Sequence, residues 1–210
     1  MEITGKKVNF LGDSITEGVY APDTCYIKVF ERKFKPAVVR NYGVGGTRIA
    51  EQTVPTKNHP EQDRDFCSRV DEMDADADIV FVMGGTNDFA HGDAPIGKLS
   101  DRDPKTFYGA CHTLMKKLIE RYPAATIVFA TPLHRINEII PGRESFERYV
   151  TAIREVAAYY SVPVLDLYAN AGICPQIKAQ FDLFMKDGVH PNDLGFERIA
   201  DRLGAFLLNL

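Results

Sequence analysis

Short apolar runs alternate along the chain with longer stretches in which apolar residues recur at helical spacing. Five such runs cover residues 8–11, 37–42, 79–83, 126–130 and 162–167. Their hydrophobicity is continuous rather than alternating, which is typical of strands buried on both faces of a parallel sheet. The alternation of these strands with helices predicts an α/β protein whose helices cover both faces of the sheet.

Four segments show the apolar stripe of an amphipathic helix. The stripes are Tyr26, Val29 and Phe30; Phe107, Ala110, Cys111, Leu114 and Leu118; Phe146, Tyr149, Val150, Ile153 and Ala157; and Ile199, Leu203, Phe206, Leu207 and Leu210. Asp103 and Pro104 predict the start of the second helix, since they are a favoured N-cap and first-turn pair. No repeat or linker interrupts the pattern, so we expect residues 1–210 to form a single domain.

The segments that follow the predicted strands carry most of the polar residues of interest. They are residues 12–14, 43–47, 84–88 and 131–135, and a last connection, residues 187–192, precedes the final helix. In open parallel sheets, functional sites lie at the carboxyl ends of the strands. We therefore expect these segments to meet at one edge of the sheet, although small and polar residues are common there in any such protein.

Charge and cysteine content exclude several kinds of partner. The formal net charge of −4 argues against a nucleic-acid-binding face, which is basic. No apolar run is long enough to span a membrane, and the N-terminus has no apolar leader, so we expect a cytoplasmic protein. The four cysteines form no C-x-x-C pair, which predicts free and mostly buried thiols rather than a zinc or redox site.

Ser14, Asp187 and His190 are the candidate catalytic residues. Ser14 follows a strand, and its hydroxyl would need a neighbouring base to act as a nucleophile. His190 lies three residues after Asp187, a spacing at which the carboxylate can orient the imidazole. Each also has a structural interpretation: Ser14 can be a helix cap, and His190 can be partly buried in a loop that Asn192 caps.

Asn87 and Gly46 are candidates for an oxyanion hole. The amide of Asn87 can donate a hydrogen bond to a developing negative charge, and Gly46 can bring a backbone N–H close to the substrate. The alternative for Asn87 is a residue of a tight turn.

Three further polar residues lie in loops where they can contact a substrate or simply cover the surface. His91 belongs to the long segment 89–103, a candidate binding loop or lid, and His134 and Arg135 follow the fourth predicted strand.

Two other patterns resemble known ligand-binding motifs but lack residues that those motifs require. Residues 74–78 imitate a calcium loop without its glycine and glutamate, and residues 43–46 lack the lysine of a P-loop. We expect no metal and no cofactor.

Four sequence blocks together resemble the SGNH, or GDSL-like, hydrolase family. They are Gly12-Asp13-Ser14-Ile15, Asn41-x-Gly43-x-Gly45-Gly46-Thr47, Gly85-x-Asn87-Asp88 and Asp187-x-x-His190-Pro191. The resemblance implies a three-layer flavodoxin-like fold with a five-stranded parallel sheet in the order 2-1-3-4-5. It implies Ser14 as nucleophile, His190 and Asp187 as its partners, and Ser14, Gly46 and Asn87 as the oxyanion hole. Ile15 stands where the family name has leucine, an exchange of one apolar residue for another.

The resemblance implies a serine esterase. We expect a small-molecule ester substrate with a short acyl group, acetyl above all, carried on a sugar, and no nucleic-acid or membrane partner. The alternatives are a thioesterase, an amidase or a lysophospholipase-type acylhydrolase on the same triad, and a non-catalytic module that binds phosphate or nucleotides. The oligomeric state stays open.

Overall fold

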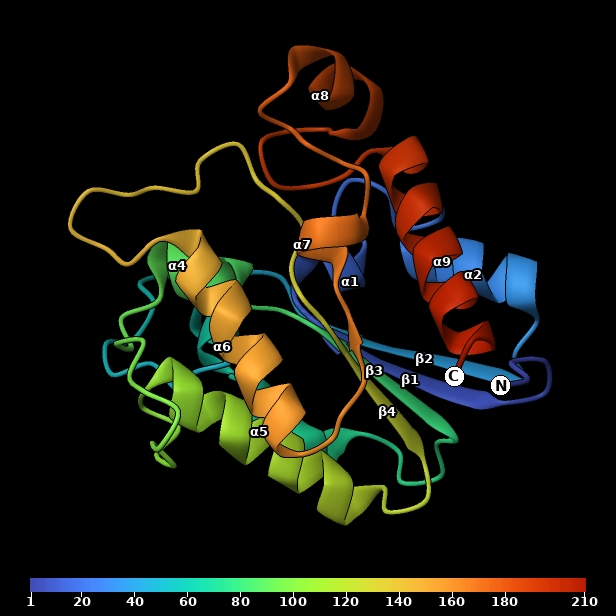
Figure 1. Ribbon diagram of the computed structural model, residues 1–210, viewed down its shortest axis with the longest axis horizontal. Helices are drawn as coiled ribbons and strands as arrows, with labels where there is room; N and C mark the ends of the chain where they lie inside the picture. Colours follow the sequence, from blue (N-terminus) through green and yellow to red (C-terminus); the bar gives the residue numbers. More distant parts are fainter.

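The computed structural model describes residues 1–210 and contains one parallel sheet in the order β2-β1-β3-β4-β5 (Figure 1). This confirms the predicted fold and strand order. In register, Gly12 at the end of β1 lies opposite Gly43 on one side and Met83 on the other. The strands are β1 (Lys7–Gly12), β2 (Val38–Gly43), β3 (Ile79–Met83), β4 (Thr126–Ala130) and β5 (Val164–Leu165).

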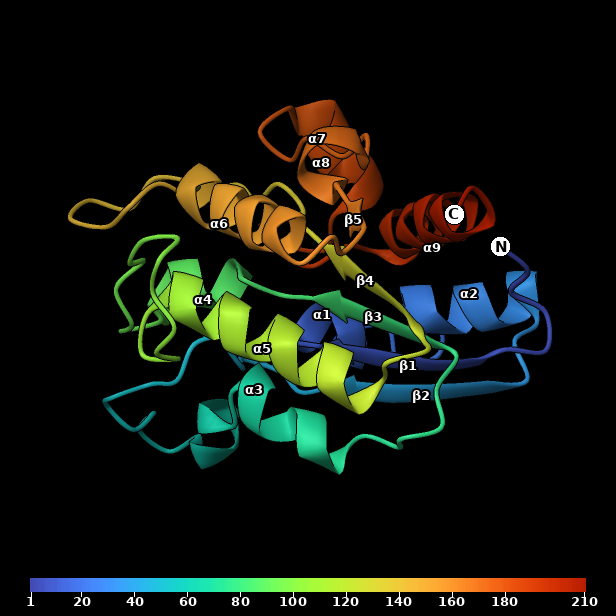
Figure 2. The ribbon, with the colours of Figure 1, turned by 60° about the horizontal axis from the view of Figure 1, so that its bottom comes forward.

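Helices cover both faces of the sheet. In Figure 2, α2 and α9 lie over one face, whereas α3 and α5 lie beneath the other. The pairs α2–α9 and α5–α6 pack against each other. The helices are α1 (Ser14–Glu17), α2 (Tyr26–Phe34), α3 (Phe66–Arg69), α4 (Thr86–His91), α5 (Phe107–Arg121), α6 (Phe146–Tyr159), α7 (Leu167–Asn170), α8 (Lys178–Phe184) and α9 (Asp193–Leu208), with 3₁₀ turns η1 (Pro60–Asp63) and η2 (Val70–Glu72).

The continuous hydrophobicity of the strands reflects two separate cores. Phe10 and Phe81 belong to the core beneath α2 and α9, whereas Leu11 and Val82 belong to the core beneath α5 and α6. Successive side chains of a strand point to opposite faces, so a strand covered on both sides needs apolar residues at every position.

Two predicted boundaries are wrong. Helix α5 begins at Phe107, and its cap is Thr106, whose hydroxyl accepts a hydrogen bond from Gly109 N. Asp103 instead forms a separate turn just before the helix, in which its carbonyl accepts from Thr106 N. The fifth strand is only Val164–Leu165, because Pro163 has no N–H to donate and Asp166 already caps α7.

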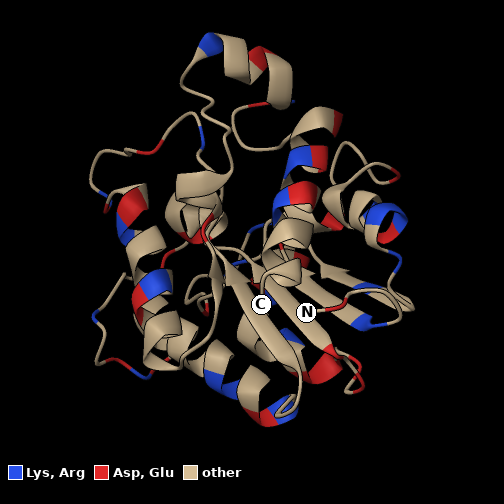
Figure 3. Ribbon diagram, turned by 45° about the vertical axis from the view of Figure 1, so that its right-hand side comes forward, with Lys and Arg blue, Asp and Glu red and all other residues tan.

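Charged residues of both signs are mixed over the helices and loops in Figure 3, and the strands carry few of them. This distribution agrees with the small net charge and shows no extended basic face on the side in view. None of the helices has both the length and the apolar character required to traverse a bilayer.

Candidate active site

Ser14 lies at the carboxyl end of β1, as the first residue of α1. The cap of this helix is Asp13, whose carboxylate accepts a hydrogen bond from Ile15 N at 3.1 Å. Gly12 makes room for the turn, because a Cβ there would lie 2.0 Å from Thr16 Oγ1. The helix-cap interpretation of Ser14 is therefore wrong, and its hydroxyl is left for another partner.

That partner is His190, which the loop before α9 brings to the same edge of the sheet. Ser14 Oγ lies 2.8 Å from His190 Nε2, and His190 Nδ1 lies 2.9 Å from Asp187 Oδ2. The other oxygen of Asp187 accepts from the backbone N–H groups of Val189 and His190, each at 2.7 Å. The carboxylate thus holds both the imidazole and the loop that carries it.

The hydrogen bonds between Ser14, His190 and Asp187 determine which ring nitrogen of His190 carries the proton. An ionised Asp187 only accepts, so Nδ1 of His190 carries the proton and Nε2 presents its lone pair to the Ser14 hydroxyl. Partial burial alone would raise the pKa of Asp187. The hydrogen bonds from His190 and Val189 outweigh it and hold that pKa below its ordinary value. Asp187 is therefore ionised at neutral pH and can stabilise a positive charge on the ring.

The candidate oxyanion donors come from the segments after β1, β2 and β3. Asn87 Nδ2 donates to the Thr47 carbonyl at 2.9 Å, which leaves one of its two amide hydrogens free. Gly46 has φ +75°, and its N–H donates to no group in the chain. A Cβ on Gly45 would lie 3.7 Å from Ser14 Cβ, so this loop passes beside Ser14. The Ser14 N–H, at the first helical position, has no acceptor within the helix.

Asp88 ties the helix of Asn87 to the loop of Gly46. Its two carboxylate oxygens accept from Ile49 N at 3.0 Å and Ala50 N at 2.9 Å. The side chain is buried, and burial raises its pKa to about 6, against the lowering effect of the two N–H groups. In the sequence, Asp88 belongs to the block Gly85-x-Asn87-Asp88, and no role was predicted for it. Its position directly after Asn87, a candidate oxyanion donor, could have indicated that it holds that residue in place.

Arg69 on α3 is a second residue that the sequence analysis missed. It is buried, and its guanidinium donates to the Tyr42 carbonyl at 2.6 Å, the Gly12 carbonyl at 3.1 Å and Thr47 Oγ1 at 2.9 Å. It therefore fixes the ends of β1 and β2 to the loop that carries Gly46. No motif surrounds Arg69 in the sequence, and its partners lie far from it along the chain.

Two of the candidate substrate contacts are already engaged within the chain. His134 stacks on Tyr168 with ring centroids 3.8 Å apart, and its Nδ1 lies 2.7 Å from a carboxylate oxygen of Glu138. Arg135 donates to the carbonyl of Thr86 at 3.0 Å and so holds the start of α4.

His91 lines a polar cavity on the Asn87 side of the site. It lies one helical turn after Asn87, on the same face of α4, and its Nδ1 accepts from Arg48 at 2.9 Å. Burial, followed by the charge of Arg48, lowers the pKa of His91 to about 4, so its ring is neutral. The cavity measures about 530 Å³ and is lined by Arg48, Gln52, Val54, Thr56, Gln62, His91 and Asp93.

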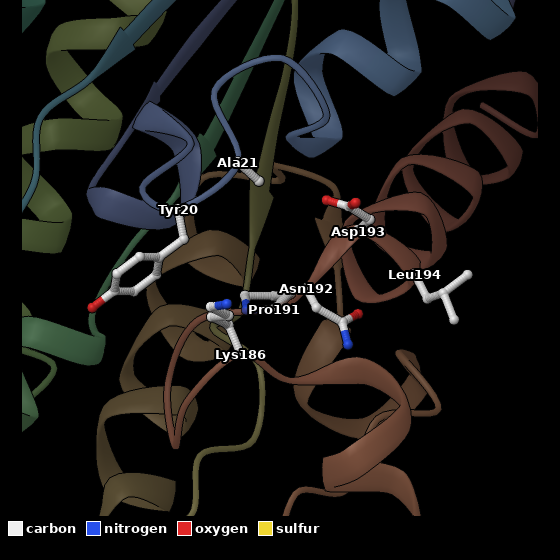
Figure 4. A pocket seen from close by; sticks show the side chains of 7 residues that line it. All are labelled: Tyr20, Ala21, Lys186, Pro191, Asn192, Asp193 and Leu194. Carbon is white, nitrogen blue, oxygen red and sulfur yellow. The ribbon is translucent and has the colours of Figure 1, made fainter.

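A second cavity, of about 340 Å³, is lined by Tyr20, which contacts His190, and by Pro191, which follows it (Figure 4). Its side chains come from the loop after α1, the loop that leads into α9 and the first residues of α9. The ring of Tyr20 meets the imidazole of His190 edge-on, with centroids 5.4 Å apart and an interplanar angle of 84°. The lining residues are Tyr20, Ala21, Lys186, Pro191, Asn192, Asp193 and Leu194.

The structure holds no cluster of three His, Cys, Asp or Glu side chains arranged for a metal ion. The four cysteines are free thiols; three of them are buried, and Cys174 is partly exposed.

Comparisons with known proteins show which family and which solved structures the chain resembles. The model of the GDSL-like lipase/acylhydrolase family matches residues 10–198. One solved structure is 32% identical, covers 100% of this chain and 99% of its own, and has a TM-score of 0.88. A protein from Lactobacillus plantarum is 29% identical over 99% of this chain and 98% of its own, with a TM-score of 0.87. Axe2, an acetylxylan esterase from Geobacillus stearothermophilus, is 23% identical over 99% and 96%, with a TM-score of 0.66. No curated protein sequence matches the chain.

Proposed function

The chain belongs to the GDSL-like lipase/acylhydrolase family and is a carboxylic ester hydrolase, and on that premise we propose that Ser14, His190 and Asp187 form its catalytic triad. The observation that carries the proposal is the continuous hydrogen-bond path from Ser14 Oγ through the imidazole to the carboxylate, at 2.8 and 2.9 Å. A serine hydroxyl is a weak nucleophile, and an adjacent base of this kind is what activates it.

In the first half of the reaction, Ser14 Oγ bonds to the carbonyl carbon of the ester while His190 Nε2 takes the hydroxyl proton. The electron pair of the C=O double bond moves to its oxygen. The N–H groups of Ser14 and Gly46 and the amide of Asn87 donate to this oxyanion. The intermediate then expels the alcohol oxygen, which receives the proton from Nε2, and the acyl group stays on Ser14.

In the second half, water replaces the alcohol. His190 takes a proton from the water as its oxygen bonds to the acyl carbon, and the same three donors hold the second oxyanion. The bond to Ser14 Oγ then breaks, the proton returns to that oxygen, and the carboxylic acid leaves. Every proton moves between groups of this chain, the substrate and water, so the proposed cycle requires no cofactor.

We propose a short acyl group, acetyl above all, on a hydroxylated alcohol such as a sugar. The two cavities next to the site support this choice, because most of the side chains that line them are polar. The likeness to an acetylxylan esterase fits an acetylated sugar, although at 23% identity it shows the fold alone. A cytoplasmic location stays a prediction.

One observation favours a second candidate, a lysophospholipase-type acylhydrolase for longer chains. Ile136 and Ile139 are 46% and 81% exposed, and Ile136 N donates to the Gly188 carbonyl, in the loop between Asp187 and His190. An apolar rim so close to the site could receive an acyl tail. No feature of the structure favours a thioester or an amide as substrate. The match to a hydrolase family does not support the alternative of a non-catalytic module that binds phosphate or nucleotides.

A series of p-nitrophenyl esters of rising acyl length tests both candidates. We expect kcat/KM to be highest for acetyl and butyryl esters and to fall beyond about eight carbons, since methylenes left in water forgo about 0.8 kcal/mol each. Ser14→Ala should abolish turnover of every ester. A maximum at long chains with activation at a lipid interface would support the second candidate, and full activity of the Ser14→Ala enzyme would contradict both.

A further inference from the structure

Tyr20 lies in the turn after α1, with its side chain exposed beside His190. It has φ +70°, in the left-handed region that bulky residues rarely adopt, and it is 62% exposed. Its hydroxyl makes no hydrogen bond within the chain. Its aromatic contact is with His190, edge-on at 5.4 Å. Its φ is that of the third residue of a turn, which the hydrogen bond from Ala21 N to the Gly18 carbonyl at 2.9 Å closes. The turn thus presents an exposed aromatic ring beside His190, where it can contact a substrate.

The chemistry of the proposed reaction places the leaving alcohol beside His190. Nε2 must hand its proton to the departing oxygen, so that oxygen comes within hydrogen-bond reach of the imidazole. The cavity of Figure 4 adjoins this ring through Tyr20 and through Pro191, the residue after His190. Its volume of about 340 Å³ is within the range of small-ligand sites. It is therefore the candidate space for the rest of the alcohol.

The polar groups of this cavity indicate what kind of alcohol fits. The amide of Asn192 is partly used, since it donates one of its two hydrogens to the Leu183 carbonyl and accepts from Gly195 N. One carboxylate oxygen of Asp193 accepts from Thr24, which leaves the other oxygen free.

The ammonium of Lys186 forms no ion pair or hydrogen bond within the chain, so the cavity offers free N–H groups on Lys186 and Asn192 and a free carboxylate oxygen on Asp193. Hydroxyl groups can use both, because each donates and accepts. The opposite charges of Lys186 and Asp193 cancel, which favours a neutral ligand over a phosphate or another anion.

We propose that this cavity binds the leaving alcohol as a neutral polyhydroxylated ring, of the sugar class, which packs against the ring of Tyr20 while Lys186 and Asp193 bind its hydroxyl groups. The inference rests on the proposed esterase function and deepens it by assigning the alcohol side of the substrate. It makes Tyr20 a substrate-binding residue.

The experiment compares two acetate esters that differ only in the alcohol. One is a methyl pyranoside that carries a single acetyl group, and the other is ethyl acetate, whose alcohol is too small to reach Tyr20. Both give the same acetyl-enzyme, so a defect confined to alcohol binding affects kcat/KM for the sugar ester alone. Tyr159→Ala is the matched control, since Tyr159 is 61% exposed and lies on α6, away from the cavity.

We expect Tyr20→Ala to lower kcat/KM about tenfold for the sugar ester and less than twofold for ethyl acetate, the range expected for the loss of one stacking contact. Tyr20→Phe should retain most of the sugar-ester activity, because it keeps the ring. Lys186→Met should lower kcat/KM for the sugar ester several-fold, whereas Lys178→Met, on the exposed surface of α8, should not.

Equal losses for both esters in Tyr20→Ala would overturn the inference, because they would show that Tyr20 only positions His190. Unchanged kinetics with both esters would overturn it as well. Failure of the esterase proposal itself looks different: the wild-type enzyme would hydrolyse neither ester, or Ser14→Ala would hydrolyse both.

Discussion

The side-chain amide of Asn87 donates a hydrogen bond to the carbonyl oxygen of Thr47 at 2.9 Å. This contact joins the segment after β3 to the segment after β2. Thr47 follows Gly46 directly, so the hydrogen bond fixes the position of Asn87 relative to Gly46, the other proposed oxyanion donor from these segments. The bond uses one hydrogen of the amide and aligns the other, which is how a donor can be ready before charge develops on the substrate.

Replacement of Asn87 by alanine should therefore affect the transition state more than the ground state. We expect Asn87→Ala to lower kcat by about 10²–10³ and to change KM little, the usual result for one lost oxyanion donor. Steady-state kinetics on p-nitrophenyl acetate measure both constants, with Asn170→Ala, at the exposed end of α7, as the control. A rise in KM alone would instead make Asn87 a turn or binding residue.

The two partners of Ser14 should differ in the size of their effects. His190→Ala removes the base itself and should cost about 10⁶ in kcat, whereas Asp187→Ala should cost about 10⁴, because Asp187 orients the ring without taking its proton. The exposed Asp182→Ala is a matched control. Wild-type activity in His190→Ala would refute the triad.

Asp13 should make the stability of the protein depend on pH. Burial raises its pKa to about 6, against hydrogen bonding by Ile15 N and the charge of His190, from an ordinary value of 3.8. Between about pH 4 and 6 the folded state binds more protons than the unfolded state at this group. Its contribution to the free energy of unfolding is therefore fully present below about pH 4 and is lost as the pH rises through 6.

The variant that isolates this effect is Asp13→Asn, since asparagine is an equally good helix cap but does not titrate. Urea unfolding from pH 4 to pH 7 should show that the loss of stability with rising pH is smaller in Asp13→Asn than in the wild type. The exposed Asp23→Asn should follow the wild type. Identical pH profiles for Asp13→Asn and the wild type would show that Asp13 does not titrate in this window.

Relief of the strain at Tyr20 should stabilise the protein while it impairs sugar-ester turnover. Glycine adopts φ +70° without a steric penalty, so Tyr20→Gly should gain about 1 kcal/mol, or about 2–4 °C in Tm. Lys35→Gly is the matched control, because Lys35 has φ +50° at the end of α2, away from the cavity. Calorimetry should show both variants stabilised, with the sugar ester affected only in Tyr20→Gly. A lower Tm for Tyr20→Gly would mean that the contact with His190 outweighs the strain.

The fold was predictable from the sequence because its signals are local. Continuous apolar runs identify strands covered on both faces, and the structure divides Phe10 and Leu11 between two cores as that pattern requires. The start of α5 was not predictable, since Asp103 and Thr106 are both good caps and only packing of Phe107 in the core decides between them.

The residues that bear chemistry were easier to identify than those that hold them in place. Ser14 and His190 lie in short motifs of recognisable spacing, and the structure brings them within 2.8 Å. Arg69 and Asp88 act through contacts with backbone atoms of distant segments. Every residue has a backbone carbonyl, and nearly every residue has a backbone N–H, so a side chain that binds such groups cannot be recognised from the identity of its partners in the sequence. Tyr20 was missed because its significance lies in its contact with His190, which is distant from it along the chain.

Covalent labelling of Ser14 tests the central claim most directly. A fluorophosphonate reacts with a serine only when a neighbouring base activates it. Intact-protein mass spectrometry followed by peptide mapping should show a single adduct, on Ser14. The adduct should be absent in Ser14→Ala and strongly reduced in His190→Ala, and unchanged in Ser161→Ala, a serine outside the site. An unlabelled wild-type protein, or an adduct on another residue, would contradict the account.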